Sequence, residues 1–148
     1  MSESKASYQQ KGHFDLEYGV TRLLNFKKLV GNKGESIAED YLKQKGYKII
    51  QKNYRCRFGE IDIIAKDQDT IVFVEVRTKQ NDNFGSPQDS ITPAKIEKIS
   101  KTSLSFIQEK KFAGFSYRFD FIAITFSQGK PNIEHIENAF IPIDRYMF

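Results

Sequence analysis

The chain has 148 residues and a mass of 17.2 kDa, the length of one ordinary domain, and its 13 Phe and 7 Tyr exclude an intrinsically disordered protein. No stretch approaches the roughly 18 consecutive apolar residues of a membrane helix, and the N-terminal residues lack the apolar run of a secretory signal. The single cysteine, Cys56, excludes an internal disulfide framework and a cysteine-based zinc site. We therefore expect a cytoplasmic protein that makes no membrane contact, and its net charge of +4 suits a polyanionic partner.

The N-terminal third of the chain contains one predicted helix. Residues 1–30 are predicted to be an N-terminal arm or a short helix, and residues 31–148 the folded domain. The first helix of that domain is expected over residues 33–45, because apolar side chains recur there at the i, i+4 spacing of one helix face. Gly46 supplies the C-terminal stop.

Three strand-like runs follow this helix. They are YKIIQKNYRC (residues 47–56), GEIDIIA (59–65) and TIVFVEVRT (70–78). The turn-prone segment KDQD separates the last two runs, so we expect three consecutive antiparallel strands.

The remainder of the chain is predicted to be a helix and one or two strands. Thr92 can cap a helix over residues 93–110, and Pro93 suits its first turn. A buried strand is expected over residues 116–126, and a further strand over 132–141. The order helix, three strands, helix, strand predicts an α/β domain with a central mixed sheet flanked by helices.

Charged residues interrupt the second predicted strand. Alternation places Glu60 and Asp62 on one face of this strand, and Ile61 and Ile63 on the other. An unpaired buried charge is costly, so two acids in an apolar strand need a chemical explanation.

The third predicted strand has the same feature, since Glu75 and Arg77 share one of its faces. If the hairpin turns about the step from Gln68 to Asp69, Asp62 lies opposite Glu75 and Glu60 lies opposite Arg77. A slip of one residue would change this register.

Two carboxylates that meet across strands repel each other unless a cation lies between them. A hard divalent ion such as Mg²⁺ takes oxygen ligands of this kind, so Asp62 and Glu75 predict a metal site. Glu35 can add a third carboxylate, and the carbonyl of Val76 can complete the set. Such a site can orient and deprotonate a water for attack on a phosphodiester.

Structural explanations of the same residues stay open. Glu35 alone is more often an ordinary first-turn acid that the helix dipole favours. Asp62 and Glu75 can also form an ion-pair network with the neighbouring cations Arg57, Arg77 and Lys79.

These residues resemble a known pattern. Asp62, followed thirteen residues later by the triplet Glu75-Val76-Arg77, resembles the PD-(D/E)XK nuclease pattern with its helix, three strands, helix, strand core. The run NYRCRFGEIDIIAKDQDTIVFVEVRTKQNDNFGSP, flanked by GESIAEDYL and RFDFIAI, is similar to the bacterial YraN-like family. That uncharacterised group is related to Holliday-junction resolvases and other restriction-endonuclease-like proteins. The resemblance covers about residues 31–126.

The resemblance implies Asp62 and Glu75 as ligands of Mg²⁺ or Mn²⁺, and Glu35 as an accessory acid. Arg77 stands where the nuclease pattern usually has lysine. Arginine stays protonated and can only hold phosphate, whereas a desolvated lysine can assist the attacking water. Lys79, two residues on, is the predicted substitute.

Two groups of cations are candidates for contact with nucleic-acid phosphates. One is the trio that opens the second helix at three-residue spacing: Lys95, Lys98 and Lys101. The other is the end of a basic stretch between residues 43 and 57: Arg55 and Arg57. Each of these cations alone is more often a solvated surface charge.

Other polar residues are assigned structural roles. Asp120 is expected to make a structural hydrogen bond at the start of a buried strand. Neither His13 nor His135 has a nearby ligand pattern, and Cys56 has no visible catalytic partner. The FGSP loop is a further candidate for contact with a nucleic-acid backbone.

The hypothesis from the sequence is a Mg²⁺-dependent endonuclease of restriction-endonuclease-like fold that acts on DNA, with branched or structured DNA as one candidate substrate. The first alternative is a nucleic-acid-binding module that kept the fold and lost the reaction. The second is a scaffold or assembly protein whose carboxylates are only ion-paired. The resolvase-like resemblance also implies a homodimer.

Overall fold

The computed structural model describes residues 11–79 and 87–143, so most of the FGSP loop and the side chain of His13 lie outside the described part. The chain divides into two compact units, residues 1–33 and 34–148. Within the described residues, no helix has both the length and the apolar character needed to cross a membrane.

Helix α1 (Lys11–Gln44) is much longer than the sequence predicted. Its C-terminal end agrees with the predicted helix over 33–45, but its start was placed too late. The segment before Lys33 contains no proline, and a lone glycine costs a helix only about 1 kcal/mol, so Gly31 does not stop it. Among the side chains of this first unit that the structure describes, Leu23, Leu24, Phe26 and Leu29 are exposed.

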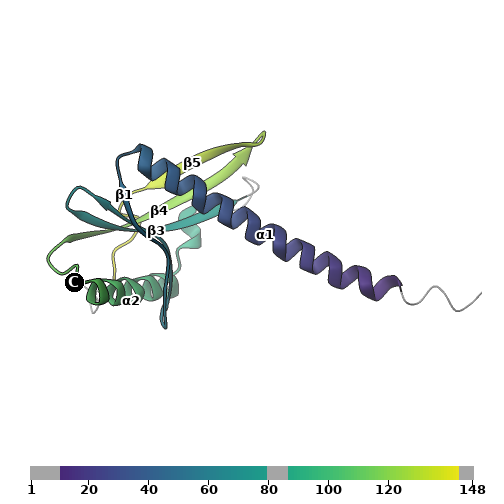
Figure 1. Ribbon diagram of the computed structural model, residues 1–148, viewed down its shortest axis with the longest axis horizontal. Helices are drawn as coiled ribbons and strands as arrows, with labels where there is room; N and C mark the ends of the chain where they lie inside the picture. The colour runs from purple at the N-terminus through teal and green to yellow at the C-terminus, as the bar shows by residue number, and fades with distance from the viewer. Residues whose placement is uncertain (1–10, 80–86, 144–148) are drawn as a thin grey trace, which may run out of the picture. The chain divides into compact units, whose positions relative to one another are not determined.

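A five-stranded mixed sheet forms the centre of the second unit (Figure 1). Its strands, in spatial and chain order, are β1 (Lys48–Cys56), β2 (Gly59–Asp67), β3 (Thr70–Lys79), β4 (Ser116–Ser127) and β5 (Lys130–Ile136). Neighbouring strands run antiparallel except β3 and β4, which are parallel. The predicted α/β class is confirmed and each of the five predicted strands is present, but the last one was placed too far along the chain, since β5 ends at Ile136 and residues 137–141 are not strand.

Helix α2 (Pro93–Lys110) provides the crossover that a parallel pair of strands requires, and a short 3-10 helix, η1 (Pro87–Ser90), precedes it. The side chain of Thr92 accepts a hydrogen bond from the main-chain N–H of Lys95 at 3.2 Å. The helix ends at Lys111, whose backbone is left-handed with φ 56°. The predicted bounds are confirmed, and the start carries a signal that is visible in the sequence, the Thr92 cap.

Two hydrophobic cores lie on opposite faces of the sheet. Residues 34–44 of α1 contribute Ala38 and Leu42 to one core, where they pack against Val72 and Val74 of β3. Helix α2 contributes residues such as Phe106 to the other core, which includes Phe73 of β3. The sheet is therefore covered on both faces, as in other layered α/β folds.

The hairpin between β2 and β3 has the register that the sequence predicted. Ile63 pairs with Val74, and Asp67 with Thr70. The predicted alternation along β2 is wrong at one point, since Ile61 belongs to the α2-side core and Ile63 to the α1-side core. The strand opposite is distorted there, because Asn53 of β1 has a left-handed backbone with φ 49°.

Candidate active site

A pocket of about 240 Å³ lies where β2, β3 and α2 meet. Its lining contains both central carboxylates of the sequence hypothesis, Asp62 and Glu75, and two of the predicted phosphate contacts, Lys95 and Lys98. Glu60 and Gly59 complete the lining on the side of β2, and Ile99 on the side of α2. The fold thus brings together residues up to 40 positions apart in the chain.

Asp62 is an acid of this pocket whose pKa is strongly raised. Its Oδ2 accepts a hydrogen bond from the main-chain N–H of Val76 at 2.8 Å. Burial raises the pKa of Asp62 to about 7, and the nearby charge of Glu75 acts in the same direction. The side chain therefore exchanges a proton near neutral pH, which is typical of groups at functional sites.

Glu75 lies beside Asp62 and contacts two cations. Its Oε1 forms a short ion pair with the ammonium of Lys95, from the first turn of α2. The guanidinium Nε of Arg77 lies 3.4 Å from the same oxygen. Lys95 is only 19% exposed and Arg77 is 49% exposed, so Lys95 is the partner held inside the site.

Glu35 reaches the site from α1. A Cβ atom at the preceding residue, Gly34, would lie 1.9 Å from Oγ1 of Thr78, so glycine lets the helix pass close to β3. With its amide nitrogen turned toward the acids, Asn53 donates to Glu35 and to Glu60, at 3.1 Å each. The Glu35 carboxylate therefore lies beside the three acids of the pocket, which we call the acidic cluster: Glu60, Asp62 and Glu75.

The pKa values of Glu35 and Asp62 depend on the neighbouring acids. Burial raises the pKa of Glu35, the hydrogen bond from Asn53 opposes that rise, and the charges of Glu60 and Glu75 add to it. Glu35 in turn raises the pKa of Asp62. The explanation of Glu35 as a first-turn acid is wrong, because the helix begins 24 residues earlier, at Lys11.

A divalent ion fits the donor chemistry of Asp62 and Glu75. Hard oxygen ligands suit Mg²⁺ and Mn²⁺. Burial is the main cause of the raised pKa of Asp62, and the negative charge of Glu75, which a cation would offset, is the second. Within residues 11–79 and 87–143, no three side chains of His, Cys, Asp or Glu are gathered as a ready metal cage. The available set is two carboxylates, to which the Val76 carbonyl and water ligands would be added.

The remaining predicted residues lie around this pocket in different settings. Arg55 pairs with Glu60 at 3.0 Å, and Lys101 pairs with Glu97 at 3.0 Å. Lys79 ends β3, so the strand continues far enough to place it on the face of Arg77. The structure thus gathers Asp62, Glu75 and Lys95 closely and leaves the arginines at the rim.

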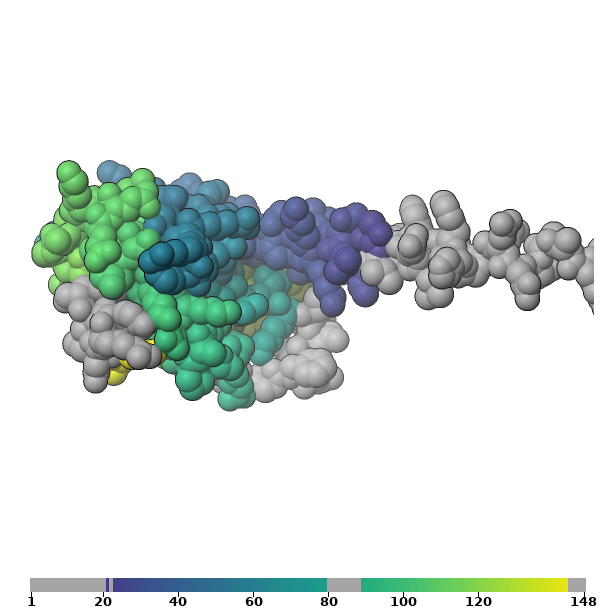
Figure 2. Space-filling model, turned by 90° about the horizontal axis from the view of Figure 1, so that it is seen from below, coloured from purple at the N-terminus to yellow at the C-terminus, as the bar shows by residue number. Residues whose placement is uncertain are grey.

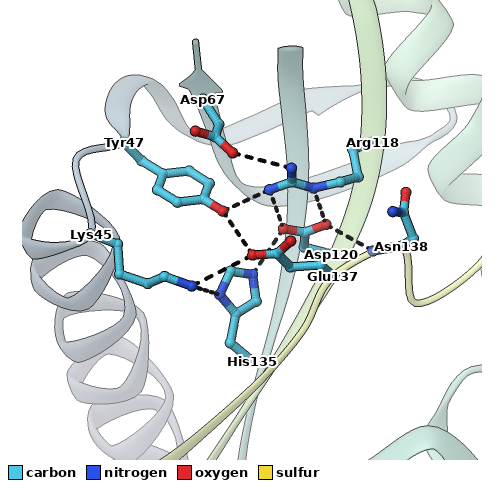
Figure 3. Close-up of polar contacts among 8 residues, drawn as sticks. All are labelled: Lys45, Tyr47, Asp67, Arg118, Asp120, His135, Glu137 and Asn138. Carbon is cyan, nitrogen blue, oxygen red and sulfur yellow. Dashed lines mark hydrogen bonds and ion pairs between the residues drawn. The ribbon is translucent and has the colours of Figure 1, made fainter.

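A second polar cluster, around Asp120, is buried on the other face of the sheet (Figure 3). Asp120 is fully buried and accepts hydrogen bonds from the guanidinium of Arg118 and from the main-chain N–H of Asn138. His135 Nε2 lies 2.8 Å from the other carboxylate oxygen. Burial alone would raise the pKa of Asp120, but the hydrogen bonds with His135 and Arg118 hold that pKa below its usual value.

This cluster joins three strands, β2, β4 and β5, to the turn after α1. Arg118 also bonds Asp67 and the hydroxyl of Tyr47, and Lys45 approaches His135 Nδ1 at 3.4 Å (Figure 3). Sequence reasoning predicted a structural hydrogen bond for Asp120 but assigned no role to His135 or Tyr47. No sequence motif marks these two residues, because they lie in separate segments that only the folded sheet brings together.

The strand order and the helical crossover make this an α/β protein consistent with a restriction-endonuclease-like core. The chain belongs to the uncharacterised protein family UPF0102, whose sequence pattern matches residues 34–124. The predicted YraN-like resemblance is thereby confirmed.

Relatives of this family align with most of the chain. A UPF0102 protein of Geobacter metallireducens is 50% identical over 113 residues, which are 76% of this chain and 93% of the relative. One of Syntrophus aciditrophicus is 48% identical over 110 residues, with coverage of 74% and 87%. One of Persephonella marina is 45% identical over 115 residues, with coverage of 78% and 96%.

Proposed function

We propose that this protein is a metal-dependent endonuclease that hydrolyses phosphodiester bonds in DNA. The observation that carries the proposal is the convergence of Asp62 and Glu75 on one pocket with Lys95, together with the pKa of Asp62 near 7. Structural ion pairs alone would normally lower the pKa of a carboxylate. The pKa of Asp62 is instead raised, first by burial and second by the negative charge of Glu75, and a bound cation would offset the second of these.

Asp62 and Glu75 would hold Mg²⁺ or Mn²⁺, with the Val76 carbonyl beside them. Such an ion, when bound, supplies charge stabilisation at the phosphate and lowers the pKa of a bound water. The hydrogen bond from the Val76 N–H holds the Asp62 carboxylate in place, so that its oxygen stays directed at the proposed ion. Glu35 and Asn53 keep Glu60 and the rest of the acidic cluster in a fixed arrangement.

We assign to Lys95 the role of the lysine in the nuclease pattern, because this chain has Arg77 at the position of that lysine. Its ammonium contacts Glu75 and lies inside the pocket, where it can hydrogen-bond a phosphate oxygen or the attacking water. Arg77 and Lys98 then neutralise the flanking phosphates. Lys79 is the alternative lysine on the same strand as Arg77.

Cleavage of labelled DNA tests the proposal. Linear, single-stranded and four-way branched substrates of one sequence are incubated with the protein in Mg²⁺, Mn²⁺ or EDTA. We expect products with a divalent ion and none with EDTA, and Asp62→Asn and Glu75→Gln should lose cleavage while keeping the fold. Glu134→Gln removes an exposed acid of β5 and should cleave normally. Cleavage that survives both site changes would overturn the assignment.

A second candidate function is a nucleic-acid-binding module without catalysis. It is favoured by Arg77 at the lysine position and by the ion pair that already occupies Glu75. This alternative predicts salt-sensitive DNA binding and no product with any divalent ion.

DNA is the proposed partner in both cases, and we propose the cytoplasm as the compartment, since a chain with one cysteine has no disulfide framework to maintain. The homodimer implied by the resemblance is a separate expectation, which sedimentation equilibrium of the purified protein measures.

A further inference from the structure

A second pocket adjoins the candidate active site along α2. It has a volume of about 370 Å³ and is lined by Arg57, Phe58, Lys101, Leu104, Ser105 and Gln108. The first two residues belong to the turn between β1 and β2, and the others to α2. In Figure 2 the blue atoms of this hairpin lie against the green atoms of α2.

The two pockets share one wall. Gly59 lines the first pocket and directly follows Phe58, which lines the second. A Cβ atom at Gly59 would lie 3.3 Å from Oγ1 of Thr102, so the hairpin backbone is packed onto α2 at this point. Lys98 of the first pocket and Lys101 of the second are one helical turn apart on α2.

The second pocket presents a flat aromatic surface with a cation. The guanidinium carbon of Arg57 lies 4.6 Å from the centroid of the Phe58 ring. Phe58 is half-buried and outside the α2-side core, whereas the rings of Tyr54 and Phe106 are buried in that core. An aromatic ring and a guanidinium plane are the surfaces on which nucleobases stack.

The other lining groups suit the edge and the phosphate of a nucleotide. Gln108 offers an amide and Ser105 a hydroxyl, which can donate to and accept from a base edge. Lys101 adds positive charge, shared with Glu97 at 3.0 Å. The pocket therefore combines stacking, hydrogen bonding and phosphate attraction.

We infer that this pocket binds an unpaired nucleobase of the DNA strand whose backbone enters the candidate active site, with Phe58 as the stacking residue. The inference rests on the proposed function and specifies its substrate class, which is DNA with a single-stranded or unpaired segment next to the cleaved bond. Phe58 and Asp62 are four residues apart in the chain, so their Cα atoms lie at most about 14 Å apart, and a short unpaired segment next to the cleaved bond can reach both. A base inside an intact duplex is stacked on its neighbours and cannot use the Phe58 surface.

Equilibrium binding in Ca²⁺ tests this inference without cleavage. Three oligonucleotides of one sequence are compared: a blunt duplex, a duplex with a single-stranded tail, and the single strand, each with 2-aminopurine as a fluorescent base. The variants are Phe58→Leu, which removes the ring, and Phe58→Tyr, which keeps it. The matched control is Phe115→Leu, since Phe115 is also half-buried with a cation, Lys66, over its ring.

We expect the unaltered protein to bind tailed and single-stranded DNA more tightly than the blunt duplex, with quenching of the 2-aminopurine. Phe58→Leu should weaken binding of the tailed DNA by about 5- to 100-fold and lose the quenching, because one base stack contributes about that factor. Phe58→Tyr and Phe115→Leu should behave as the unaltered protein. Gln108→Ala, on the exposed face of α2, gives a second test with less risk to folding and should weaken binding of the tailed DNA only.

The outcomes separate this inference from the proposed function. Equal binding of all three DNAs, or unchanged binding and quenching by folded Phe58→Leu, would overturn the base pocket while metal-dependent cleavage by Asp62 and Glu75 stood. Intact base binding without cleavage would contradict the nuclease and retain the pocket. Absence of binding to any DNA would overturn both.

Discussion

Asp62 is half-buried next to Glu75, Glu35 adds a further negative charge, and the N–H of Val76 donates a hydrogen bond to the Asp62 carboxylate. The folded protein consequently holds the Asp62 proton more tightly than the unfolded chain, in which its pKa is 3.8. A raised acid pKa stabilises the fold below the unfolded value, and that contribution is lost as pH rises toward about 7. In EDTA at alkaline pH, the site therefore destabilises the protein.

The first prediction concerns Asp62→Asn. At pH 8 in EDTA this variant should melt roughly 5 °C or more above the unaltered protein, because relief of about 2 kcal/mol gives such a shift in a domain of this size. The amide oxygen can still accept the N–H of Val76. The difference in Tm should shrink as pH falls toward 4, and Asp40→Asn, an exposed acid of α1, should show none. A pH-independent difference would contradict the raised pKa.

The second prediction concerns Lys95. If its ammonium assists the reaction, Lys95→Met should reduce the cleavage rate by about 100-fold at saturating DNA, the usual effect of losing one pre-organised donor. Lys48→Met removes an exposed lysine from the far end of β1 and serves as the control. Full activity of Lys95→Met, with loss in Lys79→Met, would move the role to Lys79.

At the scale of elements, the fold depends on signals that differ in strength. The start of α2 was predictable because Thr92 and Pro93 are local signals, whereas its left-handed end lies at a lysine, Lys111, which carries no such signal in the sequence. The start of α1 was not predictable, since no cap or proline marks it and Gly31 gave a false boundary. The distortion opposite Asn53 was also hidden, because a left-handed backbone at a single residue of a strand leaves no periodic trace.

The third prediction concerns the close approach of α1 to β3. Gly34→Ala places a Cβ 1.9 Å from Oγ1 of Thr78 and should destabilise the protein by about 1–3 kcal/mol, measured by urea unfolding. Addition of Thr78→Ala should recover most of the loss. Gly31→Ala is the matched control, because nothing lies within 4 Å of its added Cβ and a helix favours alanine. Equal stability of the two single variants would contradict the close approach.

At the scale of the whole molecule, sequence reasoning predicted a mixed sheet and the register of the β2–β3 hairpin, which brings Asp62 near Glu75, because the register depends on alternation and one turn. It assigned Lys95 to phosphate contact and did not anticipate its ion pair with Glu75, which depends on how α2 packs on the sheet. Of the Asp120 cluster, sequence reasoning predicted a role for Asp120 alone, since the partners come from β2, β5 and the turn after α1. Long-range packing is the part that local patterns do not encode.

The fourth prediction is the pH profile of stability in EDTA. The lowered pKa of Asp120 gives stability that is present above about pH 4 and lost as pH falls further, whereas Asp62 and Glu35 weaken the fold as pH rises toward neutrality. The Tm should therefore be highest at mildly acidic pH, near 5, and fall on both sides. Asp120→Asn should lower the maximum by several degrees, and a profile that keeps rising from pH 5 to pH 8 would contradict the account.

The most direct test of the nuclease is the single-turnover cleavage rate. Protein in excess over labelled, tailed DNA is mixed with Mn²⁺, so that the rate reports the chemical step after binding. We predict measurable cleavage by the unaltered protein and by Glu134→Gln, and loss of cleavage in EDTA and in Asp62→Asn with DNA binding retained. DNA that binds tightly and stays intact in Mg²⁺ and Mn²⁺, or an Asp62→Asn variant that cleaves at the unaltered rate, would contradict the central claim.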